Sequence, residues 1–365
     1  MSLSLYVHVP FCRHRCTYCN FYFLTRKADP RYLEALKREF LLRKDSLPSL
    51  PLNAFYLGGG TPSWLPREDL RDLLGFFAPC LSGDTEGTME CNPEDLGEDL
   101  LEFLESSGMN RISLGLQSLS ARELKRSARG HSPEKGRKAL ALASGSKLDL
   151  SVDLIIGLPE QTEGSFRESL EEVLDYSPEH LSLYTLELDE PVPLRKVFQK
   201  HPEWDPGEDF RATCYLWAHE RLAKAGYEHY EVSNWALPGK RCAYNESIWQ
   251  GGEYMGLGPS AHSCLGGQRF GWPADLELWQ KELLAGRSPS PLPDKRGKEE
   301  KTLEELLLGL RTDRGIAARH PLLKDKEALL ASFRDEGWAS LRDGHWCLSA
   351  EGWIRMDGIL SRLNT

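Results

Sequence analysis

Three closely spaced cysteines are the residues of this chain best suited to metal chemistry. Cys12, Cys16 and Cys19 follow a C-x3-C-x2-C spacing on one short segment. A cubane [4Fe-4S] cluster has four irons, so three thiolates leave one iron free for a ligand that is not protein. A closed structural zinc site would need a fourth donor, which His8, His14 or a remote cysteine could supply. The spacing favours an iron–sulfur site and leaves zinc as the alternative.

The total of nine cysteines is odd, and the other six are scattered singly along the chain. This usage argues against a disulfide framework and for a metal or redox site in a reducing compartment. The scattered cysteines are most simply buried small hydrophobic residues.

A glycine-rich turn and an aromatic ring add candidate ligand contacts. Gly58, Gly59 and Gly60, with Thr61 and Pro62 after them, directly follow an apolar run, and glycines allow a ligand to approach the backbone closely. The segment lacks the lysine of a phosphate loop and the spacing of a dinucleotide fingerprint, so a tight turn is the simpler alternative to a phosphate site. Tyr18 lies between the second and third cysteines, where its ring could stack on a nucleobase or pack on the protein.

Six short apolar runs alternate with amphipathic helical stretches in the first half of the chain, which predicts parallel strands joined by crossover helices. The runs are Leu3–Val9, Ala54–Leu57, Thr88–Cys91, Arg111–Leu116, Leu150–Ile156 and Leu181–Leu186. The pattern predicts an α/β fold, either a doubly wound sheet or a partial (β/α)6 barrel, with ligands at the carboxyl ends of the strands. The candidate residues fall at those ends: Cys12, Gly58 to Thr61, Glu90 with Asn92, and Gln117.

Breaks in the pattern predict three regions. Residues 1–190 form the core barrel. Residues 191–290 form a connecting and barrel-completing segment with a long helix near 210–225 and an aromatic, glycine-rich stretch at 244–271. A polar, proline-rich segment at 284–300 marks a boundary, and residues 291–365 form a small accessory domain with winged-helix character, in which Asp343 and Gly344 make a hairpin turn.

Composition limits the cellular location and the classes of partner expected for the protein. The 365 residues carry a net charge of −10, which gives no general attraction to nucleic acid. The first residues lack a basic segment leading into an apolar one, and no stretch approaches the length of a membrane span. We therefore expect a cytoplasmic protein with no transmembrane segment and no nucleic-acid partner.

Seven motifs in a fixed order resemble a known family. YVHVPFC, C-x3-C-x-Y-C, GGGTP, MECNP, RISLGLQS, the later Arg129 and VDLIIGLP are similar to the motifs of radical-SAM proteins of the oxygen-independent coproporphyrinogen III oxidase type and its heme-chaperone (HemW-like) relatives. The likeness covers nearly the whole chain, because the C-terminal unit also resembles the accessory domain of that family. It implies a partial (β/α)6 radical-SAM barrel, a [4Fe-4S] cluster and S-adenosylmethionine (SAM).

The resemblance also implies a role for each candidate residue. Cys12, Cys16 and Cys19 would ligate the cluster, and the amine and carboxylate of SAM would chelate its open iron. At the methionine part of SAM, the resemblance implies contacts of Gly58, Gly59, Gly60, Thr61 and Glu90 with the ammonium, of Arg129 with the carboxylate and of Tyr6 with the methionine end. At the nucleoside part, it implies contacts of Asp153 with the ribose and of Tyr18 with the adenine. Gln117 would contact polar atoms nearby. Each of these charged residues also has a simpler interpretation. Glu90 and Arg129 could be members of surface ion pairs, and Asp153 could cap the end of a strand. Cleavage of SAM would release a 5'-deoxyadenosyl radical and would need an electron donor such as flavodoxin or ferredoxin.

Two features favour the heme-chaperone branch over the oxidase. The oxidase pattern has a fourth cysteine after the triad and an extension before YVHxPFC, whereas this sequence has Asn20 and Phe21 there and five residues before Tyr6. The segment GLGPSAHS resembles the chaperone branch. That branch typically shows His-Asn-x-x-Tyr-Trp for heme, and here the first position is Tyr244. Tyr244, as tyrosinate, and His262 are the candidate heme ligands, with a packed side chain as the alternative for each.

Three functions stay open. The first is a heme chaperone that binds heme and delivers it to an acceptor protein. The second is a radical-SAM enzyme on another substrate, such as a methyltransferase, and the third is an oxygen-independent coproporphyrinogen III oxidase. We assign no catalytic residue, because one fold hosts many functions.

Overall fold

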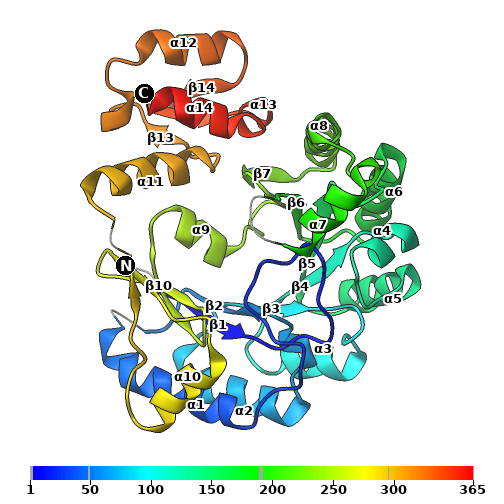
Figure 1. Cartoon of the computed structure of the whole chain (residues 1–365), viewed down its shortest axis with the longest axis vertical. Helices are drawn as coiled ribbons and strands as arrows, with labels where there is room; N and C mark the ends of the chain where they lie inside the picture. The colour runs from blue at the N-terminus through cyan, green and yellow to red at the C-terminus, as the bar shows by residue number, and fades with distance from the viewer. Residues whose placement is uncertain (1–2, 48–49, 189–191, 295, 365) are drawn as a thin grey trace.

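The computed structural model describes residues 3–47, 50–188, 192–294 and 296–364, and most of them surround one large sheet (Figure 1). Within these ranges the sheet has the order β12-β11-β10-β9-β1-β2-β3-β4-β5-β6-β8-β7. Its first six strands in chain order match the predicted runs: β1 (Leu3–Val9), β2 (Ala54–Gly59), β3 (Glu86–Cys91), β4 (Arg111–Gln117), β5 (Asp149–Ile156) and β6 (His180–Thr185). Each pairs in parallel with the next, which confirms the predicted α/β architecture.

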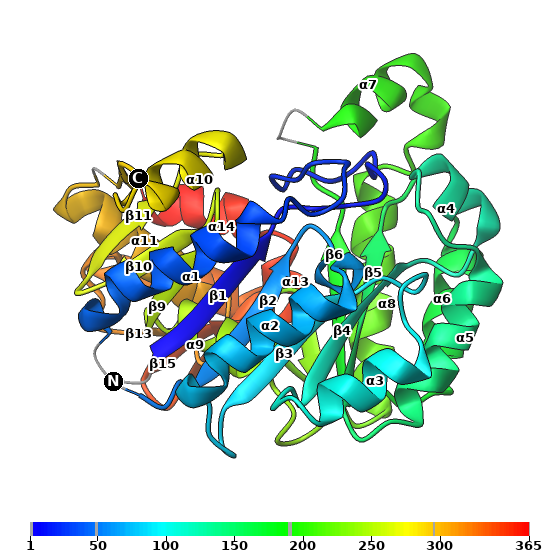
Figure 2. The ribbon, with the colours of Figure 1, turned by 90° about the horizontal axis from the view of Figure 1, so that it is seen from below.

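Helices connect these strands and cover the outer face of the curved sheet (Figures 1 and 2). They are α1 (Arg31–Arg43), α2 (Arg67–Phe77), α3 (Glu98–Glu105), α4 (Ala121–Arg126), α5 (Pro133–Ser144) and α6 (Glu163–Leu174). Short 3-10 turns occupy Lys44–Ser46, Pro62–Trp64, Ala78–Cys80, Pro202–Trp204 and Pro321–Leu323.

Side chains alternate along the parallel strands with a period of two. One set is apolar and belongs to the main core, for example Leu5, Leu57 and Leu183. The other set is largely polar and includes Glu90 and Asp153. A polar inner face of a curved parallel sheet is unlike a filled apolar barrel centre, and it leaves chemistry-bearing groups facing one another.

The segment after β6 extends the sheet at both edges. Helices α7 (Pro193–Lys200) and α8 (Glu208–Lys224) lead into β7 (Glu228–Glu231) and β8 (Asn234–Ala236), and β8 pairs antiparallel with β6. Helix α9 (Ala243–Trp249) then crosses to β9 (Glu253–Leu257), which pairs in parallel with β1. The six predicted strands therefore gain a seventh parallel neighbour that the sequence pattern did not indicate. Strands β10 (His262–Leu265), β11 (Gln268–Gly271) and β12 (Leu292–Pro293), with α10 (Leu276–Leu284), complete this edge.

A buried carboxylate ties α1 to this added edge. Glu39 is fully buried and accepts hydrogen bonds from Arg43 (2.7 Å), the Gly258 amide (2.9 Å) and the indoles of Trp272 and Trp279. A buried charge is stable only when its oxygens are satisfied in this way. Glu39 thereby fixes the turn between β9 and β10 against the barrel.

The C-terminal unit packs against the β7 edge of the sheet, where the Asp313 amide donates to the Tyr230 carbonyl (2.9 Å) (Figure 1). It comprises α11 (Lys298–Leu310), α12 (Glu327–Asp335), α13 (Ala350–Trp353), α14 (Met356–Leu363) and a small sheet of β13 (Ile316–Ala317), β14 (Ala339–Arg342) and β15 (His345–Leu348). Asp343 (φ 48°) and Gly344 (φ 75°) form the predicted two-residue hairpin turn, both in the left-handed region that a type I′ turn requires. Since β12 still belongs to the large sheet, the division at residues 190 and 290 stays a prediction.

Among the described residues, no helix combines the length and the apolar character needed to cross a bilayer.

Candidate functional site

The cysteine loop leaves the carboxyl end of β1 and closes on itself. Residue Phe11 bridges to Leu24, the Cys12 amide donates to the Leu24 carbonyl (3.0 Å), and the Leu24 amide donates to the Pro10 carbonyl (2.7 Å). All three cysteines of the loop are free thiols that are partly exposed. Burial raises the pKa of the Cys12 thiol to about 12 and that of the Cys19 thiol to about 11.

The donor set fits an iron–sulfur cluster by number and chemistry. Within residues 3–47, 50–188, 192–294 and 296–364, no three His, Cys, Asp or Glu side chains are grouped closely enough to hold a metal ion as they stand. Three free thiols on one loop nevertheless match the three-thiolate requirement of a cubane with one open iron. Because thiolates are the ligating form, binding a metal group there would release the protons of Cys12 and Cys19.

A chain of hydrogen bonds connects the loop to the ends of β2, β3 and α4. The Thr61 hydroxyl donates to Cys12 Sγ (3.3 Å), and the Asn92 side-chain amide donates to Thr61 Oγ1 (3.2 Å). The Arg129 guanidinium closes the chain, because it donates to Asn92 Oδ1 (3.0 Å) and to Cys16 Sγ (3.6 Å). Predicted residues from three separate segments therefore meet, and Asn92 is the link between them.

Arg129 and Gln117 both hold polar atoms without partners. Among the described residues Arg129 forms no ion pair with a carboxylate, and its Nε is buried without a hydrogen bond. The Gln117 Oε1 atom is buried and unpartnered as well, and Gln117 has a φ of 61° at a bulge between β4 and β5. Such groups are costly unless a ligand or water satisfies them. Both lie beside Gly115, whose carbonyl accepts from Arg129.

The glycine turn brings backbone against Glu90. The Gly59 amide donates to Glu90 Oε2 (3.0 Å), and a Cβ atom at Gly58 would lie 2.7 Å from Glu90 Oε1. Gly59 has a φ of 106°, and a Cβ atom there would lie 2.6 Å from the His8 ring. A larger residue at either position would displace one of these groups, so the close approach explains the glycines.

Two carboxyl groups with raised pKa values face the same interior. Burial, and then repulsion from Asp153, raises the pKa of Glu90 to about 7. The hydrogen bonds that Glu90 accepts from the Gly59 amide and from Tyr56 act in the opposite direction. Burial raises the pKa of Asp153 to about 6, opposed by hydrogen bonds from Ser182 and Ser113 (Ser113 Oγ to Oδ2 3.0 Å). Paired acids of this kind are typical of sites that bind a cation or transfer protons.

Tyr6 and Tyr244 belong to one aromatic group with Tyr56. The Tyr6 and Tyr244 rings stack at 5.9 Å between centroids, and Tyr56 lies 4.8 Å from Tyr244. His8 Nε2 lies 2.8 Å from the Tyr22 carbonyl and so carries the proton, which lets His8 Nδ1 accept from the Tyr6 hydroxyl (3.0 Å). Burial raises the pKa of the Tyr244 phenol well above its ordinary value.

Tyr18 lies at the cysteine loop: burial raises the pKa of its phenol well above the ordinary value, and Arg129 and the Cys16 thiol are close enough to act on it. Its ring also packs on a small apolar cluster that includes Leu158, Leu194 and Phe198. His262 is exposed at the start of β10, where partial burial and then Arg269 lower its pKa. The two candidate heme ligands therefore occupy different surroundings: Tyr244 at the inner face of the sheet, His262 at its added edge.

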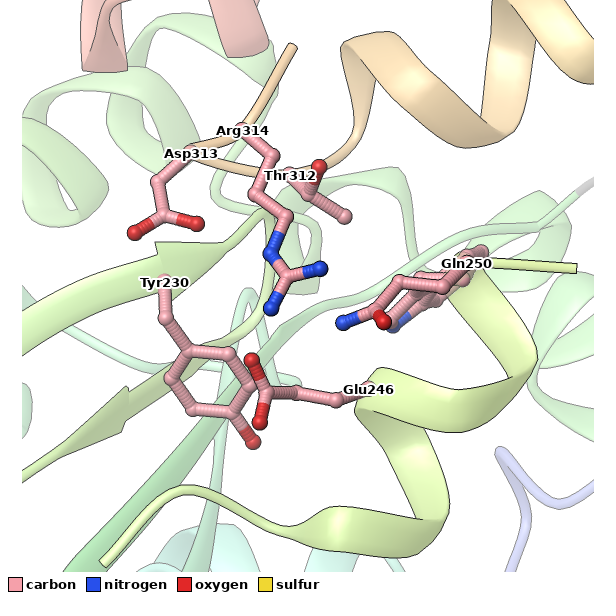
Figure 3. Close-up of a pocket in the computed structure, with 7 residues that line it drawn as sticks. Tyr230, Glu246, Gln250, Thr312, Asp313 and Arg314 are labelled. Carbon is pink, nitrogen blue, oxygen red and sulfur yellow. The ribbon is translucent and has the colours of Figure 1, made fainter. Parts of the chain in front are cut away.

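Two cavities border the inner face. One is lined by polar groups of β2 to β6 and α9, and in it Thr88 Oγ1 and the Arg111 Nε and Nη1 atoms are buried without hydrogen-bond partners. Figure 3 shows the other, at the junction with the C-terminal unit, where Arg314 points toward Glu246 and Gln250. No candidate residue from the sequence lines the junction cavity.

Sequence reasoning missed several residues that orient the predicted ones. Asn92 was noted only for its place at a strand end and His8 only as a possible zinc donor, whereas Tyr56 and the two serines that bond to Asp153 were not assigned. The signal that could have found them is polar residues at every second position of strands whose other positions are apolar, for example Ser113 and Ser182.

Comparison with known proteins agrees with this geometry. Residues 6–173 match the Radical SAM superfamily. Heme chaperone HemW of Synechocystis sp. is 34% identical over 93% of this chain and 86% of its own length, and Heme chaperone HemW of Escherichia coli is 36% identical over 71% of this chain and 69% of its length. The solved structure of coproporphyrinogen III oxidase (HemN) from Escherichia coli superposes with a TM-score of 0.81 at 21% identity, covering 100% of this chain and 90% of that one, which shows the shared fold. This chain belongs to the HemW family of the radical-SAM superfamily.

Proposed function

We propose that this protein is a radical-SAM heme chaperone, which binds heme and delivers it to an acceptor protein. The supporting observation is the likeness to several HemW heme chaperones over most of the chain. The family implies a [4Fe-4S] cluster and SAM. The hydrogen bonds that link Cys12 to Cys16 through Thr61, Asn92 and Arg129 support a common site for them. We also propose that the protein acts in the cytoplasm and that residues 291–365 form its accessory domain.

The proposed SAM contacts follow from charge and reach. Glu90 would accept from the methionyl ammonium, because it is a buried acid beside a second one, Asp153. Arg129 would pair with the carboxylate, because its Nε is buried without a hydrogen-bond partner. The backbone of Gly58 to Gly60 and Thr61 would line that end, with Tyr6 beside it, while Gln117, Asp153 and Tyr18 would contact the nucleoside. The cluster would supply the electron that cleaves SAM.

The proposed heme ligand is Tyr244 rather than His262. Its ring is held by Tyr6 and Tyr56 beside Glu90, so a heme there would lie next to the SAM contacts. Because the phenol has a raised pKa, ligation to ferric iron would have to release its proton, and a nearby carboxylate is the group suited to accept it. His262 is the second candidate because it is exposed and neutral at physiological pH.

Anaerobic reconstitution tests the proposal. Reconstituted protein should bind hemin, shown by a Soret band and a defined stoichiometry, and should pass it to an apo-heme acceptor that is recovered separately by chromatography. Parallel incubations with SAM and coproporphyrinogen III, followed by mass spectrometry, give the competing outcomes. Conversion of coproporphyrinogen III or methylation of a substrate, with hemin ignored, would replace the chaperone assignment with that of an enzyme.

A further inference from the structure

We propose that the surface around the cysteine loop is the docking face for an acidic one-electron carrier protein. This cationic face is defined by exposed side chains of the loop, α4 and α7: Arg15, Arg26, Lys27, Arg122, Lys125, Arg195, Lys196 and Lys200. The inference rests on the proposed function, because a cluster that cleaves SAM must be reduced by an external donor.

Three segments distant in sequence form this face because they are joined at one residue of the loop. The Thr17 amide donates to the carbonyl of Ser127, just after α4 (3.1 Å), and the Leu194 amide, at the start of α7, donates to the Thr17 carbonyl (2.8 Å). Thr17 lies between Cys16 and Cys19. Figure 2 shows α7 above the loop, with α4 beside it. The cysteines therefore lie where the two helices meet.

The charge of these segments is opposite to that of the protein. Residues 10–31, 121–131 and 192–201 contain twelve Lys and Arg against two acidic residues, in a chain of net charge −10. Within the described part of the chain, none of the eight side chains of the cationic face forms an ion pair with a carboxylate. Glu203 lies just after α7 and limits the face on that side.

Two neighbouring arginines form ion pairs with carboxylates and are therefore not counted in the cationic face. Arg13 pairs with Asp95 (2.6 Å) and Arg126 with Glu160 (2.7 Å). The eight remaining cations have no such partners in the described structure, so their field is available to an incoming protein. A field of one sign raises the rate of encounter with a protein of the opposite sign and is weakened by salt.

An exposed aromatic residue lies close to the cysteines within this face. Phe21 follows Cys19 by two residues and is 66% exposed, the largest exposed fraction among the exposed large hydrophobic side chains of the described residues. The Arg15 guanidinium lies over the Phe23 ring at 5.9 Å. An apolar contact surrounded by charges is the usual arrangement of a transient protein interface. Its position at the cysteine loop selects a redox protein, because the donor must approach the cluster itself.

The transfer proposed here is a single electron. The reduced donor, for example a flavodoxin hydroquinone, loses one electron and becomes the semiquinone. The site held by the cysteine loop gains that electron, and no bond is formed or broken.

Charge reversal on the cationic face provides the test. The variant Lys125→Glu/Lys196→Glu/Lys200→Glu changes three exposed residues with no assigned cofactor contact. The control is the double reversal Lys298→Glu/Lys301→Glu on α11, which lies away from the loop in both views. Binding of oxidised flavodoxin is measured by calorimetry at about 50 mM and about 500 mM salt, because screening separates electrostatic docking from other contacts. The rate of cluster reduction is compared for flavodoxin hydroquinone and dithionite.

At low salt the triple variant should bind flavodoxin on the order of tenfold more weakly and be reduced correspondingly more slowly by it, while the control matches the wild type. The difference should vanish at high salt, and dithionite should reduce all proteins equally. The neutral variant Lys125→Gln/Lys196→Gln/Lys200→Gln should fall between, which guards against misfolding of the reversed one.

Unchanged flavodoxin binding in the triple variant, or an equal loss in the control, would overturn the proposal. Equally tight binding of a duplex oligonucleotide to the same face would reassign it to nucleic acid. Hemin titration of the same preparations is the separate check on the chaperone function: absent hemin binding with salt-dependent flavodoxin binding would remove the chaperone assignment and leave the docking face standing.

Discussion

Replacement of Glu90 by Gln should raise the stability of the ligand-free protein while weakening its affinity for SAM. The wild-type carboxyl has its pKa raised to about 7, first by burial and then by Asp153. In the unfolded chain its pKa is near the ordinary value of 4.5. Between those two values the folded protein binds more protons than the unfolded one, so the free energy of unfolding falls as the pH rises through this window and stays low above it.

The size of the effect follows from that shift. The full difference between 4.5 and about 7 corresponds to about 3 kcal/mol of lost stability above pH 7. Glu90 retains some solvent access, and an amide satisfies the Gly59 and Tyr56 donors less well than a carboxylate does. We therefore expect the variant to gain about 1 to 2 kcal/mol over the wild type at pH 8, and less at pH 5, where the wild-type carboxyl is still largely protonated. Loss of the carboxylate should weaken SAM binding by about 2 kcal/mol, or roughly 30-fold.

Urea unfolding of the apo proteins at both pH values, with Glu98→Gln as the exposed control, measures the first effect, and calorimetry with SAM on reconstituted protein measures the second. A variant that is destabilised equally at both pH values would refute the assignment of a buried Glu90 with a raised pKa. Unchanged SAM affinity would remove Glu90 from the SAM site.

Three further changes test the remaining assignments. Anaerobic reconstitution should load close to four irons per chain and Cys16→Ala should abolish the brown absorption, whereas stoichiometric zinc with no iron uptake in the wild type would show a zinc site instead. Arg129→Ala should weaken SAM binding by about 2 kcal/mol with iron loading retained, and collapsed loading with normal SAM affinity would make Arg129 a structural partner of Cys16. Tyr244→Phe keeps the ring packing and removes only the oxygen, so a selective loss of the high-spin ferric hemin spectrum would identify the phenolate, while loss in His262→Ala alone would identify the imidazole.

The sequence by itself determined the order of the parallel strands and the spacing of the three cysteines. Strands β1 to β6 lie where the apolar runs placed them, because the face of each strand that packs on the helices leaves apolar residues at alternate positions. The hairpin turn at Asp343 and Gly344 was equally readable, since only certain residues adopt its backbone angles. The three-cysteine spacing and the glycine turn are local features and needed no tertiary information.

Only the tertiary structure decided which distant residues meet. The seventh parallel strand β9 pairs with β1 across about 250 residues of sequence, and no local pattern carries that pairing. The chain from Cys12 through Thr61, Asn92 and Arg129 to Cys16 is likewise invisible in the sequence, as is the stacking of Tyr244 on Tyr6. Hydrophobic periodicity reports which face of an element is buried, whereas side-chain contacts depend on the register and curvature that packing imposes on all strands together.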